Sequence, residues 1–350
     1  MSIPTSLPDI YLSFFQFSAD MKPEDLAYRQ VVVEHIKQLI SFGYSGFEFH
    51  IAPTAEANYQ QDLKNYTDLR HYLDSRGLAE IKITTNVGAT ETCDPSSPSE
   101  EVRQQALEYL KSRVDITAVL GGGIMMGPLV IPYNVFPTTD SHEPIWSDRL
   151  QDELAGRYQT AQPILNELGI YAEQKQVKLA IEPITHWETP GPNKLSQLID
   201  FLAGVESKQV GVIIDCAHEV LDGDGPEIFR EQVAELARQE RLHYVQVSPP
   251  HRGAVHTSWI PWKSFLEPIL AVYQGPIAVE MFNAIPALVD LVRITRRKFW
   301  IPGEDEPNAY PSAYEIADAA FQKTQVELKN ILDPTPNEYV ETIASRAKVF

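Results

Sequence analysis

Short apolar runs alternate with longer amphipathic stretches along the whole of this 350-residue chain. Eight of the runs are short and rich in Val, Ile, Leu and Phe, the pattern expected of strands buried on both faces of a parallel sheet. These predicted strands are Ile10–Phe17, Gly46–Ile51, Ile81–Val87, Gly123–Met126, Lys178–Ile184, Val210–Cys216, His243–Val247 and Pro276–Phe282.

The stretches between the strands show the periodicity of amphipathic helices. The predicted helices are Glu24–Phe42, Tyr59–Arg76, Ser99–Leu120, Arg149–Gln176, Lys194–Leu202, Pro226–Glu240, Trp262–Tyr273 and Tyr314–Leu332. Unbroken alternation of strand and helix predicts a (β/α)8 TIM barrel, an α/β fold, rather than an open sheet.

No linker divides the chain, so we expect one domain, with the barrel over residues 1–332 and residues 333–350 as a C-terminal tail packed on it. Two proline-rich segments, Pro132–Trp146 and Pro302–Pro311, follow the fourth and eighth strands. In a barrel they are long loops of the C-terminal face, where active sites are built.

The amino-acid composition and net charge exclude several kinds of protein. A hydrophobic fraction of 43% is enough for a large core, and a net charge of −19 leaves no basic face for nucleic acid or an anionic membrane. The two cysteines, Cys93 and Cys216, exclude a disulfide framework and a Cys-rich zinc site. With neither a signal-peptide pattern nor an apolar run of about 18 residues, we expect a soluble cytoplasmic protein.

Oxygen-bearing side chains stand at the ends of four consecutive predicted strands. They are Glu182, Asp215, Gln246 and Glu280. Buried carboxylates need a partner, a proton or a metal, and the ends of neighbouring barrel strands share one rim. An all-oxygen set suits Mg²⁺ or Mn²⁺, with Co²⁺ also compatible. The alternative is that each acid caps a strand end or forms a salt bridge.

Further polar residues lie just beyond these strand ends. Glu188, His218 and Arg252 occupy the predicted loops, where they could contact a polyol substrate. Spacing alone also allows His218 to be a structural histidine and Arg252 to form a loop salt bridge. Trp187, between two of the candidate site residues, is the best candidate for a wall of the substrate site.

These motifs resemble the xylose-isomerase-like sugar isomerase and epimerase superfamily, and most of all its D-tagatose and D-psicose 3-epimerase branch. The resemblance covers residues 80 to 285. It includes a turn at Met126-Gly127-Pro128. The matching motifs are Glu182-x5-Glu188, Asp215-x-x-His218, Gln246 followed six residues later by Arg252, and Glu280.

Two positions depart from the epimerase pattern. The epimerases usually carry histidine where this chain has Gln246, whereas hydroxypyruvate isomerases of the same superfamily resemble this chain in using glutamine as the metal ligand. After the fifth strand the epimerases commonly read Asn-Arg-Phe-Glu, and this chain reads Thr185-His186-Trp187-Glu188. The substrate site is therefore expected to differ.

The resemblance implies a metal-dependent isomerase that transfers a proton next to a carbonyl group through an enediolate. It implies that Glu182 and Glu280 are the acid/base pair and that Asp215 and Gln246 complete the metal site. Glu188, His218 and Arg252 would then hold the carbonyl and hydroxyl groups of a small sugar or keto-acid substrate.

Other functions remain open at this point. A hydroxypyruvate-type keto isomerase or an inosose-type dehydratase would use the same site. A barrel that binds a partner without catalysis is allowed by the change at Gln246. DNA repair of the endonuclease IV type shares the barrel, but it needs a multi-histidine zinc site and a basic groove. The oligomeric state is also open, since related barrels often pair through their outer helices.

Overall fold

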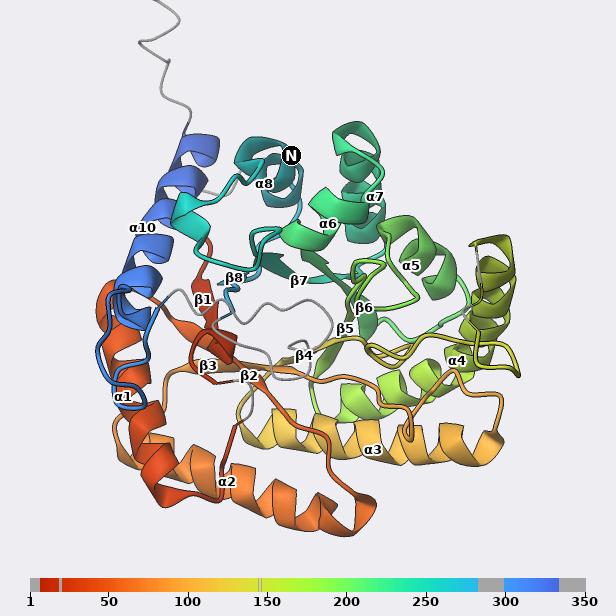
Figure 1. Cartoon of the computed structure of the whole chain (residues 1–350), viewed down its shortest axis with the longest axis horizontal. Helices are drawn as coiled ribbons and strands as arrows, with labels where there is room; N and C mark the ends of the chain where they lie inside the picture. Colours follow the sequence, from red (N-terminus) through yellow and green to blue (C-terminus); the bar gives the residue numbers. More distant parts are fainter. Residues whose placement is uncertain (1–6, 19–20, 144, 146, 283–298, 334–350) are drawn as a thin grey trace, which may run out of the picture.

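Eight parallel strands close into a barrel in the order of the sequence, which confirms the predicted TIM barrel. The structure is a computed structural model that describes residues 7–18, 21–143, 145, 147–282 and 299–333. Figure 1 shows the strands at the centre of a ring of helices. The strands are β1 (Ile10–Ser13), β2 (Gly46–His50), β3 (Lys82–Asn86), β4 (Ile124–Gly127), β5 (Lys178–Ile181), β6 (Val210–Asp215), β7 (Leu242–Val247) and β8 (Ile277–Val279).

The helices follow the strands around the barrel. They are α1 (Leu26–Phe42), α2 (Tyr59–Ser75), α3 (Glu100–Val119), α4 (Ser147–Gln174), α5 (Leu195–Leu202), α6 (Cys216–Asp222), α7 (Pro226–Arg238), α8 (Trp262–Leu270) and α10 (Ala313–Leu332). Short 3-10 helices lie at η1 (Phe14–Gln16), η2 (Glu56–Asn58) and η3 (Val255–Thr257). None of the helices in these described ranges is both long and apolar enough to cross a membrane.

Helix α10 closes the ring by packing between α1 and α8 (Figure 1). A capping box starts it, in which the side chains of Ser312 and Glu315 each accept a hydrogen bond from the other's backbone N–H. Two carbonyl groups in its first turns accept hydrogen bonds from the N-terminal part of the barrel, from Gln16 Nε2 and from Tyr44 Oη, both over 2.8 Å. These hydrogen bonds join the N-terminal and C-terminal parts of the described barrel.

Side chains fill the lower part of the barrel interior, so the barrel is a packed core rather than a pore. Tyr11 and Tyr244 lie in this layer, and the Tyr244 hydroxyl is 3.1 Å from that of Thr84. Gly46 is required beside Tyr11, because a Cβ at this position would lie 2.5 Å from the tyrosine ring. This packed layer lies below the polar side chains at the rim of the barrel and supports them.

Several predicted elements end earlier than the apolar pattern suggests, among them β1, β5, β6 and β8. β1 stops at Ser13, where the chain turns into η1 and Phe14 packs edge-on against Phe47 and Phe49. β6 stops at Asp215, and Cys216 begins α6, a helix that was not predicted from the sequence. Cys216 is buried and its thiol is free.

The two proline-rich loops differ in position. The segment after β4 runs toward α4 and contacts the loop after β5, where the Asn134 N–H donates to the Glu188 carbonyl over 3.0 Å. Residues 302–311 instead lie at the outer edge of the barrel beside α10 and α1 (Figure 1). The predicted tail at 333–350 lies outside the described residues except for Asp333, so its packing on the barrel stays a prediction.

Candidate active site

The four side chains predicted at the strand ends are all buried at the rim of the barrel. Glu182 and Glu280 follow the last residues of β5 and β8, Asp215 ends β6, and Gln246 lies beside Asp215 in the register of β6 and β7. Gln246 Nε2 donates to Glu280 Oε1 over 3.3 Å. The chain therefore places three carboxylates and an amide in one water-poor region, where electrostatic interactions are strong.

Asp215 is also the N-cap of helix α6, and this role fixes the position of its carboxylate. One of its oxygens caps α6 by accepting the Ala217 N–H over 2.7 Å, and the same oxygen accepts a hydrogen bond from Ser248 Oγ. The other oxygen, Oδ2, faces Arg252. Because α6 starts at the next residue, His218 lies in the first turn of a helix rather than in the predicted loop.

His218 is oriented as a hydrogen-bond donor toward the site. The Thr185 N–H donates to its Nδ1 over 2.9 Å, so the neutral ring carries its proton on Nε2. Nε2 lies 3.4 Å from Glu182 Oε1 and 3.8 Å from Asp215 Oδ2. A protonated ring nitrogen cannot ligate a metal, so this geometry favours hydrogen bonding to a substrate or to Glu182.

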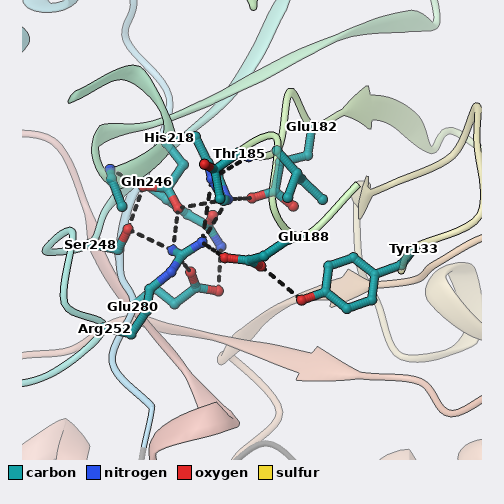
Figure 2. A network of polar contacts seen from close by, with 12 residues as sticks. Tyr133, Glu182, Thr185, Glu188, His218, Gln246, Ser248, Arg252 and Glu280 are labelled. Carbon is teal, nitrogen blue, oxygen red and sulfur yellow. Dashed lines mark hydrogen bonds and ion pairs between the residues drawn. The ribbon is translucent and has the colours of Figure 1, made fainter. Parts of the chain in front are cut away.

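Arg252 lies at the centre of the polar network (Figure 2). Its Nη1 is 3.0 Å from Asp215 Oδ2 and 3.3 Å from Glu280 Oε2, and its Nη2 is 3.5 Å from Glu188 Oε1. Burial alone would lower the pKa of the guanidinium, but the surrounding carboxylates raise the pKa above its ordinary value. Arg252 does form salt bridges, but its partners are the candidate site residues themselves, and its role toward a substrate stays a prediction.

Glu188 is held from two sides. Tyr133 Oη donates to its Oε2 over 2.7 Å, and Arg252 faces its other oxygen (Figure 2). Tyr133 was not predicted, because its loop after β4 has no periodicity and its contact spans 55 residues of sequence. Its hydroxyl is buried beside the Glu188 carboxylate, and this raises the pKa of the phenol. The pair ties the β4 loop to the site.

Trp187 does not join this network. Its side chain is 46% exposed, and its ring packs against that of His186, 5.2 Å between centroids. Its predicted role as a wall of the substrate site has no direct support from these contacts and stays a prediction.

One further buried acid at this rim was not predicted from the sequence. Glu48, in the middle of β2, is only 1% exposed, and its Oε2 accepts a hydrogen bond from Gln246 Nε2 over 2.8 Å. The signal was present, since Gly-Phe-Glu-Phe-His places a carboxylate within an apolar strand. Glu48 lies inside its strand, whereas the other candidate carboxylates were predicted at strand ends.

Burial shifts the acid/base chemistry of the rim carboxylates. It raises the pKa of Glu182, against a lowering effect of the hydrogen bond with His218. It raises the pKa of Glu280 further, and the nearby charge of Asp215 acts in the same direction. Desolvation also raises the pKa of Glu48. Carboxyl groups with raised pKa values are suited to take up and return protons near neutral pH.

The donor atoms at this rim fit a hard divalent cation. One ligand atom each of Glu182, Asp215 and His218 lies within 4.8 Å of the other two. The orientation of His218 described above leaves the two carboxylates as ligands from that group. Gln246 Oε1 adds a third candidate, because it is buried and has no hydrogen-bond partner among the described residues. Carboxylate and amide oxygens are ligands of Mg²⁺ and Mn²⁺.

Sequence comparisons agree with this fold. Residues 36–298 match the model of the xylose isomerase-like TIM barrel family. L-ribulose 3-epimerase of Methylomonas sp. is 23% identical over 205 residues, which are 58% of this chain and 65% of that enzyme. D-psicose 3-epimerase of Enterocloster bolteae is 22% identical over 218 residues, 61% of this chain and 65% of that enzyme. The chain thus matches 65% of the length of these curated relatives.

Solved structures extend the similarity along most of the chain. The crystal structure of a candidate sugar phosphate isomerase/epimerase from Anabaena variabilis is 70% identical and superposes with a TM-score of 0.91, covering 93% of this chain and 100% of that one. D-allulose 3-epimerase from Methylomonas sp., in complex with D-allulose, shares the fold with a TM-score of 0.70 at 19% identity, covering 93% of this chain and 99% of that one. The resemblance predicted from the motifs is confirmed, and the chain belongs to the xylose isomerase-like TIM barrel family.

Proposed function

We propose that this protein is a divalent-metal-dependent sugar epimerase that moves a proton at a carbon next to the carbonyl group of a ketose. The observation that carries the proposal is the placement of two buried carboxyl groups, Glu182 and Glu280, on one polar rim that also offers oxygen ligands for a cation. Such a pair can remove a proton from one side of a carbon and return one from the other.

The positions of Glu182 and Glu280 support their roles as the two groups that remove and return the proton. Glu182 follows β5 and Glu280 follows β8, and β6 and β7 lie between these strands in the barrel. The two carboxyl groups therefore reach the rim from separated strands. One takes the proton from the substrate, which becomes an enediolate, and the other delivers a proton to the opposite face of the same carbon.

Three further residues have the chemistry to hold a polyol. His218 presents an N–H, Arg252 presents guanidinium N–H groups, and Glu188 presents acceptor oxygens. Together they can donate to a carbonyl oxygen and accept from neighbouring hydroxyl groups. This supports the roles that the motifs implied for these residues.

Glu182, Asp215, Gln246 and Glu280 would hold the cation, Mn²⁺ or Mg²⁺. A divalent cation bound by these oxygens would stabilise the negative charge that develops on the substrate oxygens. The buried Gln246 Oε1, which has no hydrogen-bond partner among the described residues, supports this assignment. A neutral amide in the ligand set leaves more net positive charge on the cation than a carboxylate would.

The named relatives suggest which sugars to try first. L-ribulose 3-epimerase and D-psicose 3-epimerase point to free ketoses, and the Anabaena variabilis protein points to sugar phosphates. Gln246 favours a second candidate, a keto isomerase of the hydroxypyruvate type, because those enzymes share a glutamine ligand with this chain. The two candidates differ in the carbon that exchanges its proton.

Exchange of hydrogen with solvent tests both candidates directly. The Mn²⁺-loaded protein is incubated in D₂O with D-allulose, L-ribulose, their phosphate esters and hydroxypyruvate, and deuterium is located by NMR. Deuterium at C3 of a ketose, with formation of its epimer, is the expected result. Exchange only into hydroxypyruvate would favour the keto isomerase. No exchange into any of these compounds would overturn the proposal.

A further inference from the structure

Gln246 is the residue at which this chain departs from the epimerase pattern, and its surroundings are unusual. The side chain is 0% exposed and lies between two carboxyl groups on different strands, Glu48 of β2 and Glu280 beyond β8. Glu48 reaches it across the interior of the barrel, since β2 and β7 are not neighbours in the sheet. The Glu48 carboxyl group has no place in the acid/base scheme above.

The hydrogen bonds fix which way the Gln246 amide faces. Its Nε2 donates one N–H to Glu48 Oε2 over 2.8 Å and the other to Glu280 Oε1 over 3.3 Å. An ionised carboxylate only accepts hydrogen bonds, so with both acids ionised the reversed amide would set its oxygen against two other oxygens. Both N–H groups are thereby used, and Oε1 makes neither of these hydrogen bonds.

That oxygen is buried and has no hydrogen-bond partner in the part of the chain that the structure describes. Leaving a buried carbonyl oxygen unpaired destabilises the protein, because the oxygen has lost its hydrogen bonds to water. The cost is removed when a cation takes the oxygen as a ligand. Rotating the amide would not remove the cost, because its oxygen would then face the two acids that now accept from Nε2.

We propose that Glu48 is a positioning residue, which orients the Gln246 amide so that its oxygen is available to the divalent cation. The inference rests on the proposed function, because it assumes that a cation binds at this rim. Glu48 and Gln246 then act together, as a metal ligand and the residue that orients it. A partner that orients a metal ligand typically contributes about 10–100-fold to metal affinity.

The test is the affinity of the purified protein for Mn²⁺, measured by calorimetry without any substrate. Glu48→Gln keeps the size of the side chain and removes the acceptor-only carboxylate, so that Gln246 can face either way. We expect this variant to bind Mn²⁺ about 10–100-fold more weakly than the wild type. Glu219→Gln is the matched control, since it makes the same change in a partly buried carboxyl group whose charged neighbours are Asp224 and Lys194, and it should leave the affinity unchanged.

The exchanged pair, Glu48→Gln with Gln246→Glu, separates positioning from a general loss of structure. In it, the amide introduced at position 48 donates an N–H to the new carboxylate and the total charge is kept, while the hydrogen bond from position 246 to Glu280 is lost. We expect Mn²⁺ affinity to return to within about tenfold of the wild type. This variant also serves if Glu48→Gln fails to fold.

The outcomes distinguish the inference from the proposed function. If the wild type binds Mn²⁺ and Glu48→Gln binds it equally well, Glu48 has no positioning role and the proposed function stands. A loss in Glu48→Gln that the exchanged pair does not restore also overturns the positioning role. If the wild type binds no Mn²⁺, the metal-dependent function and the inference both fail.

Discussion

Nη1 of Arg252 lies 3.0 Å from Oδ2 of Asp215, so a cationic side chain of the protein pairs with a carboxylate that is also a candidate metal ligand. The same Nη1 is 3.3 Å from Glu280 Oε2. Its Nη2 lies 2.7 Å from His218 Nε2, where two hydrogen-bond donors face one another. The guanidinium is thus held by the carboxylates and opposed by the histidine.

A divalent cation would need the same carboxylate oxygens that hold Arg252, so the two cations should oppose each other. We expect Arg252→Gln to bind Mn²⁺ about tenfold more tightly than the wild type, because a coupling of about 1–3 kcal/mol between two sites changes affinity about 5–150-fold. Without metal, the variant should unfold at a lower temperature, since its buried acids lack a counter-charge.

Calorimetry and thermal unfolding with Mn²⁺ or EDTA check both expectations. Arg157→Gln is the control, because it removes an arginine that pairs with Asp94, away from the rim. Equal or weaker binding of Mn²⁺ by Arg252→Gln would show that the guanidinium and the metal do not compete.

The acid/base assignment predicts loss of proton exchange without loss of the fold. Glu182→Gln and Glu280→Gln keep the size of the side chains but cannot take up a proton. We expect deuterium uptake from D₂O into the substrate to fall about 10²–10⁴-fold in each variant.

Glu219→Gln provides a matched control for these two variants. Burial raises the pKa of Glu219 to about 7, but its charged neighbours are Asp224 and Lys194 rather than the rim residues. It should retain exchange close to the wild-type rate. Full activity of either Glu182→Gln or Glu280→Gln would remove that residue from the mechanism.

The barrel and four of its rim residues could be predicted because both depend on local patterns. Apolar runs specify buried strands, and a carboxylate at the end of such a run is costly enough to require an explanation. Glu182, Asp215 and Glu280 were found in this way. Glu48 carries the same signal but sits inside its strand, so it is missed when only strand ends are considered.

Two kinds of feature could not be predicted from the sequence. One is a contact between segments that lie far apart in the chain, and the other is a residue that has two structural roles. Asp215 ends an apolar run that continues into Cys216, so the start of α6 was hidden although Asp215 is also its N-cap. Tyr133 meets Glu188 only because two loops of the C-terminal face pack together. No periodicity in either loop indicates that contact.

The contact between Tyr133 and Glu188 predicts an effect on substrate binding. Tyr133→Phe removes a hydrogen bond to a buried carboxylate, a contribution of about 1.5–3 kcal/mol when the acceptor is charged. We expect kcat/KM for the ketose to fall about tenfold or more, mainly through a higher KM. Steady-state kinetics give the division between the two constants.

Tyr158→Phe is the control for Tyr133→Phe. The Tyr158 hydroxyl is buried and has no hydrogen-bond partner among the described residues, so its removal should leave the kinetics unchanged. If Tyr133→Phe also behaves like the wild type, Glu188 is held well enough by Arg252 and its own backbone, and Tyr133 has no part in binding.

Stability should fall in mildly acidic solution because of His35, which lies under α10. Its Nδ1 is 2.8 Å from Tyr314 Oη, its ring packs on Phe17, and its Nε2 is buried without a partner among the described residues. Burial lowers the pKa of His35 from 6.5 to about 4. Between these two values the unfolded chain binds more protons than the folded one, so stability rises with pH.

The contribution of His35 is therefore complete above pH 6.5 and is lost as the pH falls from 6.5 toward 4. At pH 5 the loss is about 2 kcal/mol, at about 1.36 kcal/mol per pH unit. Urea unfolding at pH 7.5, 6 and 5 measures it, with His35→Gln as a variant that cannot titrate. We expect the wild type to lose more stability than His35→Gln over this range, by roughly that amount. Parallel losses in the two proteins would mean that His35 is not held neutral in the folded state.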